Sequence, residues 1–327
     1  MTSRTFLENV GTPYSVNAIG SVRACEISHL RNDPTIPPLI YVIESAVGQQ
    51  FLLGREISGR PKFNMIRYIA KSFVELFFEQ LSGKEISQYL ILRGAYPFDL
   101  QYAFGYAPPY DRLLLPTGFI KLQRLLNKEG TGWEIHGQNF IGEYQGDTWL
   151  IPDTAIASGS TIAHFLRNGF SHHLPKRVYV ITACGSLEGI QRIYQECLKT
   201  NVGLVPIFSQ CIFEVSKVGN LPGLPLTDLS VISPGSITTE EFYEKAFRRY
   251  QGTRMCCVGD IGESLEDPLQ YSIHTLWEMQ ILGMDPKKED WSAWTVDVRE
   301  ESFQKKVSDF NPALFEYFNS LWTSSSK

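Results

Sequence analysis

This 327-residue sequence has little of three things: long apolar runs, excess positive charge, and cysteine or histidine at metal-binding spacings. No apolar run reaches about 18 residues, the length that a helix needs to span a bilayer. No signal peptide is recognisable at the N-terminus. We therefore expect no membrane partner and a cytoplasmic location.

Neither sign of charge is in large excess. The sequence has 30 lysine and arginine residues against 35 aspartate and glutamate residues, a net charge of −5. A global excess of positive charge is what favours nucleic acid, so we expect no nucleic-acid partner. If the protein binds an anion, local loops must supply the contacts.

The six cysteines are not spaced as metal ligands, and the adjacent Cys256 and Cys257 cannot easily form a normal disulfide. Most of them lie in apolar segments, and we interpret them as reduced thiols of a cytosolic protein. The histidines, including His172 and His173, lack acidic or cysteine partners at ligand spacing. We expect no metal ion held directly by protein side chains.

What is present is an ordinary globular composition, with 43% hydrophobic and 20% charged residues. The length allows one large domain or two. Strand and helix patterns alternate after residue 149, which predicts an α/β fold with a central parallel sheet flanked by helices. We predict strands at 39–43, 89–92, 112–116, 149–151, 177–183 and 203–208, a hairpin made by 133–137 and 140–144, and helices at 65–81, 98–106, 162–168, 239–250 and 271–282, with another capped by Ser186.

Residues 149–167 are the most informative stretch. An apolar run with Asp153 at its end is followed by small residues at 158–161 and then by a helical pattern. Unpaired N–H groups at the start of such a helix, together with its dipole, favour a phosphate. Asp153 could hold a ribose diol at the strand end. The alternative is an ordinary strand-to-helix turn with a serine cap.

Residues 153–161, Asp-Thr-Ala-Ile-Ala-Ser-Gly-Ser-Thr, resemble the loop that binds 5-phosphoribosyl 1-diphosphate (PRPP) in type I phosphoribosyltransferases. The pair Asp153-Thr154, in which the second residue is not acidic, is similar to the uracil phosphoribosyltransferase branch, as is the position of Ala157. The resemblance implies that PRPP is bound by Asp153, Thr154, Ala157, Ser158, Gly159, Ser160 and Thr161.

Residues 89–92 form an apolar strand that runs into Arg93-Gly94, which is similar to the family's pyrophosphate loop. Arg93 could fork across diphosphate oxygens, and Gly94 would let backbone N–H groups face them. On its own, such an arginine is more often a strand-end residue in a surface salt bridge. The resemblance implies diphosphate binding by both residues and catalytic roles for Arg93 and Asp153.

A third segment, Val258, Gly259, Asp260 and Ile261, resembles the hood that binds the base in uracil phosphoribosyltransferases. The family joins an Ile-x-Pro-Gly segment directly to this hood, whereas here residues 236–257 intervene, and we expect them to fold as a helical flap. Glu263 replaces the family's second acid. A Gly-Asp-x-Gly turn is also common as a plain loop.

The resemblance covers residues 55–265, which leaves 1–54 as an N-terminal extension and 266–327 as a C-terminal helical extension. It implies a type I phosphoribosyltransferase-like fold with a hood. It also implies transfer of ribose 5-phosphate from PRPP to a nucleobase, a pyrimidine such as uracil. Mg²⁺ would be bound through PRPP, with a water bridge to Asp153, and a homodimer stays open.

Two alternatives remain at this point. The altered hood and the long C-terminal segment are compatible with a regulator that senses PRPP or a nucleotide without turnover. A transferase that acts on a base other than uracil is equally compatible.

Overall fold

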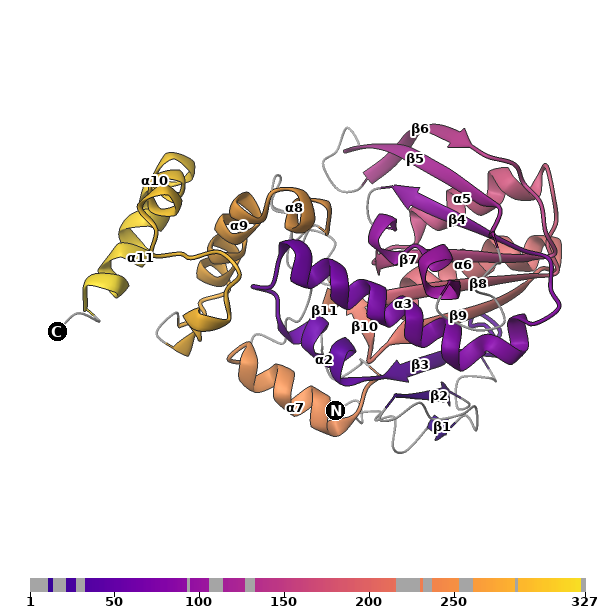
Figure 1. Ribbon diagram of the computed structural model, residues 1–327, viewed down its shortest axis with the longest axis horizontal. Helices are drawn as coiled ribbons and strands as arrows, with labels where there is room; N and C mark the ends of the chain where they lie inside the picture. The colour runs from indigo at the N-terminus through magenta and orange to yellow at the C-terminus, as the bar shows by residue number, and fades with distance from the viewer. Residues whose placement is uncertain are drawn as a thin grey trace.

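The middle strands of the sheet are apolar on both faces. In β8 (Arg177–Ser186) every residue after Arg177 is buried, and in β9 (Gly203–Ser209) every residue after Gly203 is buried. Such strands need helices on both sides, which favours a parallel sheet between helical layers. The computed structural model, which describes residues 11–13, 22–27, 33–92, 95–105, 114–126, 133–215, 230–231, 237–252, 261–285 and 288–324, has this architecture (Figure 1).

The sheet has the strand order β1-β2-β3-β9-β8-β7-β4-β5-β6. The strands from β3 to β5 in this order run parallel, and antiparallel strands close both edges. A short strand pair, β10 and β11, extends from the end of β8. The remaining strand bounds are β1 Gly11–Pro13, β2 Arg23–Ile27, β3 Tyr41–Glu44, β4 Ile86–Leu92, β5 Thr117–Leu126, β6 Trp133–Ile141, β7 Thr148–Ile156, β10 Ile212–Val215 and β11 Ser230–Val231.

Helices cover both faces of the sheet. One face packs against α5 (Ser160–Phe170) and α6 (Leu187–Thr200), through side chains such as Trp149 and Phe165. The other face packs against the long helix α3 (Gly59–Leu81), which crosses it in Figure 1. The same side carries α2 (Ala46–Leu53), the 3₁₀ turn η1 (Tyr96–Phe98) and α4 (Leu100–Phe104).

The C-terminal helices extend the second face, and their apolar side chains belong to the same core cluster as those of α3. Figure 1 shows those after residue 260 beyond one end of α3, whereas the helix Glu240–Arg249 lies beside α2. Among the described residues, no helix is both long enough and apolar enough to cross a membrane. The helices are α7 Glu240–Arg249, α8 Ile261–Glu266, α9 Pro268–Ile281, η4 Trp291–Ala293, α10 Glu301–Phe310 and α11 Pro312–Ser324.

The predicted α/β architecture is confirmed, with a mostly parallel central sheet between helices. The predicted helices at 65–81, 239–250 and 271–282 correspond to α3, α7 and α9. The predicted cap is also confirmed, because the Ser186 side chain accepts a hydrogen bond from the Gly189 N–H.

The predicted hairpin was wrong. Residues 133–141 form one strand, β6, whose partner is β5, and residues 142–144 lie outside any strand. Gly137 was the last residue of the first predicted strand, but it lies inside β6 opposite Gln123, where the register shifts at a β-bulge. Glycine inside a strand often marks such a bulge. Of the strand predicted at 112–116, residues 114–116 have no regular structure, and the remainder lies outside the described residues.

Two predicted ends were also misplaced. The strand predicted to stop before Asp153 continues as β7 to Ile156, and α5 continues through Gly169 to Phe170. Gly169 does not end the helix because it serves packing instead. A Cβ atom there would lie 3.0 Å from the rings of both Trp149 and Tyr144. The missing side chain lets α5 approach the sheet.

The core under α5 gives a stability prediction. Phe165 is fully buried, with ring centroids 5.2 Å from Tyr89 and 5.9 Å from Trp149. Phe165→Ala should lower the free energy of unfolding by about 3–5 kcal/mol, because it removes apolar burial and leaves a cavity. Chemical denaturation measures this, with Leu174→Ala, a 55% exposed residue, as the near-neutral control. Equal effects of the two variants would contradict the core packing.

Candidate functional site

The loop at residues 157–159 joins the middle of the sheet to a helix. It follows β7, which lies between β4 and β8 and is parallel to both, and it leads into α5. The predicted connection of a central parallel strand to a helix N-terminus is therefore confirmed. Open α/β sheets bind ligands beyond the carboxyl ends of their strands, which is where this loop lies. Ser158, Ser160 and Thr161 are all partly exposed there.

Gly159 caps α5 without a side chain. Its φ of +67° lies in the left-handed region, and a Cβ atom would lie 2.2 Å from the carbonyl oxygen of Gly189. No side chain caps the first turn of α5. The first N–H groups of a helix have no partner within the helix, and with the helix dipole they attract anions. The loop therefore offers backbone donors together with the Ser158 and Ser160 hydroxyls, which are 3.0 Å apart.

A second helix start lies against this loop. The Ser186 hydroxyl donates a hydrogen bond to the Ala157 carbonyl at 2.5 Å and accepts one from the Gly189 N–H at 2.9 Å. A Cβ atom on Gly189 would lie 2.4 Å from the Ala157 carbonyl oxygen. The N-termini of α5 and α6 are thus held side by side, and both dipoles place positive potential at the same edge of the sheet.

Asp153 lies before the loop on β7, opposite Thr182 of β8. It is partly exposed, and its Oδ1 accepts a hydrogen bond from the Ala155 N–H at 3.4 Å. Thr154 points the other way and is fully buried. Asp153 can therefore meet a ligand through its carboxylate, whereas Thr154 can do so only through its backbone.

Most of the other predicted site residues lie outside the part of the chain that the structure describes. Arg93 and Gly94 lie outside the described residues, as do Val258, Gly259 and Asp260. Ile261 is the first residue of α8 and is buried. β4 ends at Leu92 as the parallel neighbour of β7, so the chain leaves β4 at the same edge of the sheet as the loop.

Sequence reasoning missed a cleft of about 290 Å³ beside the loop. Its wall combines the start of α6 with β10 and with Ile237, which lies two residues before the N-cap of α7. The lining residues are Leu187, Glu188, Ile212, Phe213, Glu214, Val215 and Ile237.

The described part of the chain contains no cluster of three or more His, Cys, Asp or Glu side chains suited to a metal ion. The His173 ring hydrogen-bonds the Gly146 carbonyl at the opposite end of β7, and the His172 ring stacks on Tyr144. Cys197 is a buried free thiol, and burial raises its pKa to about 12. It therefore stays protonated and inert at neutral pH.

No protein-family model matches the sequence. No curated protein matches it either. Solved structures do match. A protein of Aquifex aeolicus shares 19% identity over 54% of this chain and 90% of its own, with a TM-score of 0.39.

Two other matching structures are phosphoribosyltransferases. Adenine phosphoribosyltransferase from Trypanosoma brucei, in complex with AMP, pyrophosphate and ribose 5-phosphate, shares 11% identity over 52% of this chain and 83% of its own, with a TM-score of 0.35. Orotate phosphoribosyltransferase from Aeropyrum pernix shares 14% identity over 46% of this chain and 72% of its own, with a TM-score of 0.28. Adenine and orotate are the bases named for those two proteins.

The close approach at Gly159 gives a prediction with a matched control. Gly159→Ala should weaken binding of inorganic phosphate and destabilise the fold, because the new methyl group meets the Gly189 backbone. Gly83 has a similar φ of +71°, but nothing lies within 4 Å of its Cβ position. Gly83→Ala should therefore cost only the backbone strain, about 1–2 kcal/mol, and leave phosphate binding intact. Calorimetry with phosphate and chemical denaturation measure both, and equal losses would contradict the loop geometry.

Proposed function

We propose that this chain binds PRPP and transfers its ribosyl 5-phosphate to a nucleobase, with release of diphosphate. The observation that carries the proposal is the loop at residues 157–159, where a left-handed glycine opens α5 at the carboxyl edge of a parallel sheet. The 5′-phosphate would bind Ala157, Ser158, Gly159, Ser160 and Thr161.

Asp153 would hold the ribose hydroxyls, because it is the partly exposed carboxylate that leads into the loop. The Thr154 backbone lies next to it. Arg93 and Gly94 follow β4, the parallel neighbour of β7, and would bind the diphosphate. Val258, Gly259, Asp260 and Ile261 would present backbone edges to the base. A pyrimidine such as uracil is the acceptor we propose.

The reaction needs little covalent help from side chains. A ring nitrogen of the base forms a bond to C1 of the ribose while the bond between C1 and the diphosphate oxygen breaks. The diphosphate leaves with the electron pair, and the base nitrogen loses its proton. Charge builds on the ribose and on the leaving group, so positioning and fixed electrostatics can carry the catalysis. The paired starts of α5 and α6 supply such a field at the phosphate.

The donor set near the loop suits Mg²⁺ that arrives with its substrate. Asp153 is a single carboxylate, and the described residues contain no cluster that could cage the ion. Magnesium prefers several waters with one or two carboxylates and substrate phosphates. Bound to the diphosphate, it would neutralise charge on the leaving group. Asp153 would contact it through water.

A second candidate function is a PRPP sensor without turnover. It is favoured by helices α9 to α11, which extend beyond the segment that resembles the transferases and share one apolar core with α3. The two functions differ in a single observable, which is the release of diphosphate.

Turnover separates the candidates. Purified protein with PRPP, Mg²⁺ and a panel of uracil, adenine, orotate and other bases should release diphosphate with at least one base, and with uracil if the pyrimidine assignment holds. A coupled diphosphate assay measures this, with reactions lacking a base as the control. Binding of PRPP without release for any base would favour the sensor instead.

PRPP binding should depend on Asp153 and Arg93. Asp153→Asn and Arg93→Ala each remove a charge-assisted contact, worth roughly 1.5–3 kcal/mol or about tenfold to a hundredfold in affinity. Asp147→Asn is the matched control, because Asp147 precedes the other end of β7 and pairs with Lys176 at 2.8 Å. Calorimetry with PRPP and Mg²⁺ measures all three variants. Wild-type affinity in both site variants would refute these assignments.

A further inference from the structure

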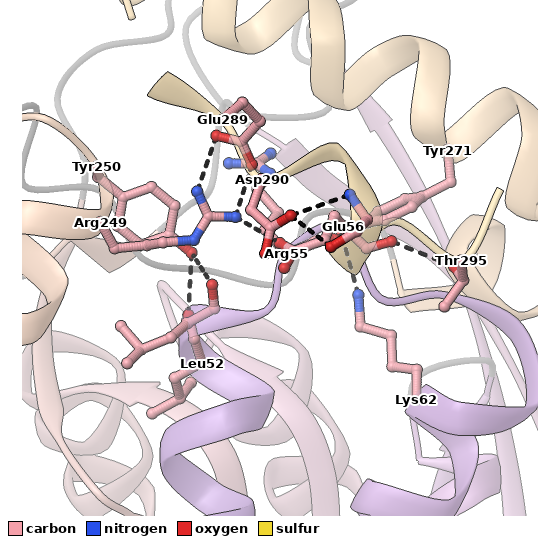
Figure 2. A network of polar contacts seen from close by, with 12 residues as sticks. Leu52, Arg55, Glu56, Lys62, Arg249, Tyr250, Tyr271, Glu289, Asp290 and Thr295 are labelled. Atoms are coloured by element: carbon pink, nitrogen blue, oxygen red, sulfur yellow. Dashed lines mark hydrogen bonds and ion pairs between the residues drawn. The ribbon is translucent and has the colours of Figure 1, made fainter. Parts of the chain in front are cut away.

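Helix α7 connects two places in the molecule. It begins directly after the cleft wall and ends in a buried network of charges between the core and the C-terminal helices (Figure 2). The charges along α7 suit its dipole, with Glu240 and Glu241 in the first turn and Arg248 and Arg249 in the last. The two ends of the helix carry different contacts.

At its start, α7 is joined to the cleft by backbone bonds. Ile237 and Ile212 exchange two backbone hydrogen bonds, both of 2.9 Å, and both residues line the cleft. The Thr238 hydroxyl donates to the Gln210 carbonyl at 3.1 Å, and Thr239 caps the helix. A movement of α7 would therefore move the Ile237 wall of the cleft.

At its end, α7 is held by Arg249. The guanidinium group forms a two-pronged contact with Glu289, at 2.7 and 2.8 Å, and also donates to Glu56 at 2.9 Å. Glu56 belongs to the segment between α2 and α3, and Glu289 precedes η4. Both carboxylates are almost fully buried, with side-chain exposures of 5% and 1%. Arg249 therefore bridges the core and the C-terminal region.

Neighbouring contacts brace this bridge. The Tyr250 hydroxyl donates to the Leu52 and Leu53 carbonyls at the end of α2. Gln251 and Asp285 exchange two hydrogen bonds of 2.7 and 2.9 Å. The end of α7 thus contacts segments on both sides of it in the sequence.

A second group of charges completes the network. Arg55 and Glu278 form a fully buried ion pair. The Lys62 ammonium donates to the Tyr271 hydroxyl at 2.9 Å, and that hydroxyl donates to the Arg55 carbonyl. Two buried cations, Arg55 and Lys62, and the partly buried Arg249 thereby balance the carboxylates Glu56, Glu278 and Glu289.

We propose that Arg249 is a positioning residue for the acceptor base, with the cleft as a contact for the base additional to the backbone of residues 258–261. Its ion pairs with Glu56 and Glu289 fix α7, and α7 fixes the Ile237 wall. The proposal rests on the transferase function described above. It makes the C-terminal region a determinant of acceptor affinity, although none of the described residues that line the cleft comes from that region.

The physical reason is the buried charge. Burial raises the pKa of Glu56, while the Arg249 charge opposes that rise. Without the guanidinium group, two buried carboxylates would face each other with no cation between them. Such uncompensated charge drives local rearrangement, and we expect the end of α7, which carries residue 249, to shift. The contacts that we propose for the 5′-phosphate and the ribose lie on β7, the loop at residues 157–159 and the start of α5, and we expect this change to leave them in place.

The experiment compares Arg249→Met, Arg249→Lys and the control Arg299→Met. Arg299 pairs with the neighbouring Asp297 on the surface of the same region. Arg249→Met should raise the KM for the base by about two- to thirtyfold, the usual range for coupling through a structural element. The Kd for PRPP should stay within about twofold. The KM for the base in Arg249→Lys should lie between the values of the wild type and of Arg249→Met, because one ammonium group cannot reproduce the forked contact. Arg299→Met should have the same KM for the base and the same Kd for PRPP as the wild type.

An unchanged KM for the base in folded Arg249→Met would overturn the proposal, as would an equal loss of PRPP and base affinity, which indicates general destabilisation. If that variant does not fold, Arg249→Lys and Glu56→Gln carry the same measurement. Hydrogen exchange gives a readout independent of activity: the Ile212 and Ile237 amides should exchange faster in Arg249→Met, and those of β7 should not. If the wild type releases no diphosphate with any base, the transferase function fails, and the exchange pattern alone still decides whether Arg249 positions the cleft wall.

Discussion

Two stretches of backbone meet at Gly159 and Gly189 at a distance that leaves no room for a side chain on either residue. The approach is possible because β7 and β8 are adjacent parallel strands, so the helices that follow them start at the same edge. The Ser186 hydroxyl ties the two starts together. Farther along the same helices, Arg167 on α5 pairs with Glu196 on α6 at 2.7 Å. This hydrogen bond lowers the pKa of Glu196, which keeps the pair charged at neutral pH.

This arrangement explains how an acidic protein could present the anion site that we propose. The net charge is −5, and the attraction at the loop would come from aligned peptide dipoles and not from a basic surface. Side-chain charge is concentrated elsewhere, in the network around Arg249, where Arg55 and Arg249 face carboxylates and Lys62 donates to the Tyr271 hydroxyl. Local dipoles act over about one helical turn, so overall charge and local potential can differ in sign.

The sequence predicted the local structure correctly where a residue pattern is compatible with one arrangement of the backbone. The apolar strands fixed the sheet, and the run from Asp153 to Thr161 located the loop. It was misleading at two glycines. Gly137, where the predicted strand ended, lies inside β6, and Gly169, before which the predicted helix ended, allows α5 to approach the sheet. The cleft and the Arg249 bridge could not be foreseen, because their members come from segments far apart in the chain. Long-range pairing of charges leaves no periodic signal in a sequence.

The pairing of β3 with β9 has a consequence for how the chain acquires its structure. Tyr41 lies beside Ile207 in the sheet, and Arg55 later joins Glu278. During synthesis β3 therefore cannot pair with β9 until most of the polypeptide has been made. Contacts of such sequence separation slow folding, and the apolar face of α3 stays uncovered meanwhile. We expect nascent chains of this protein to need protection from aggregation until the last helices have emerged from the ribosome.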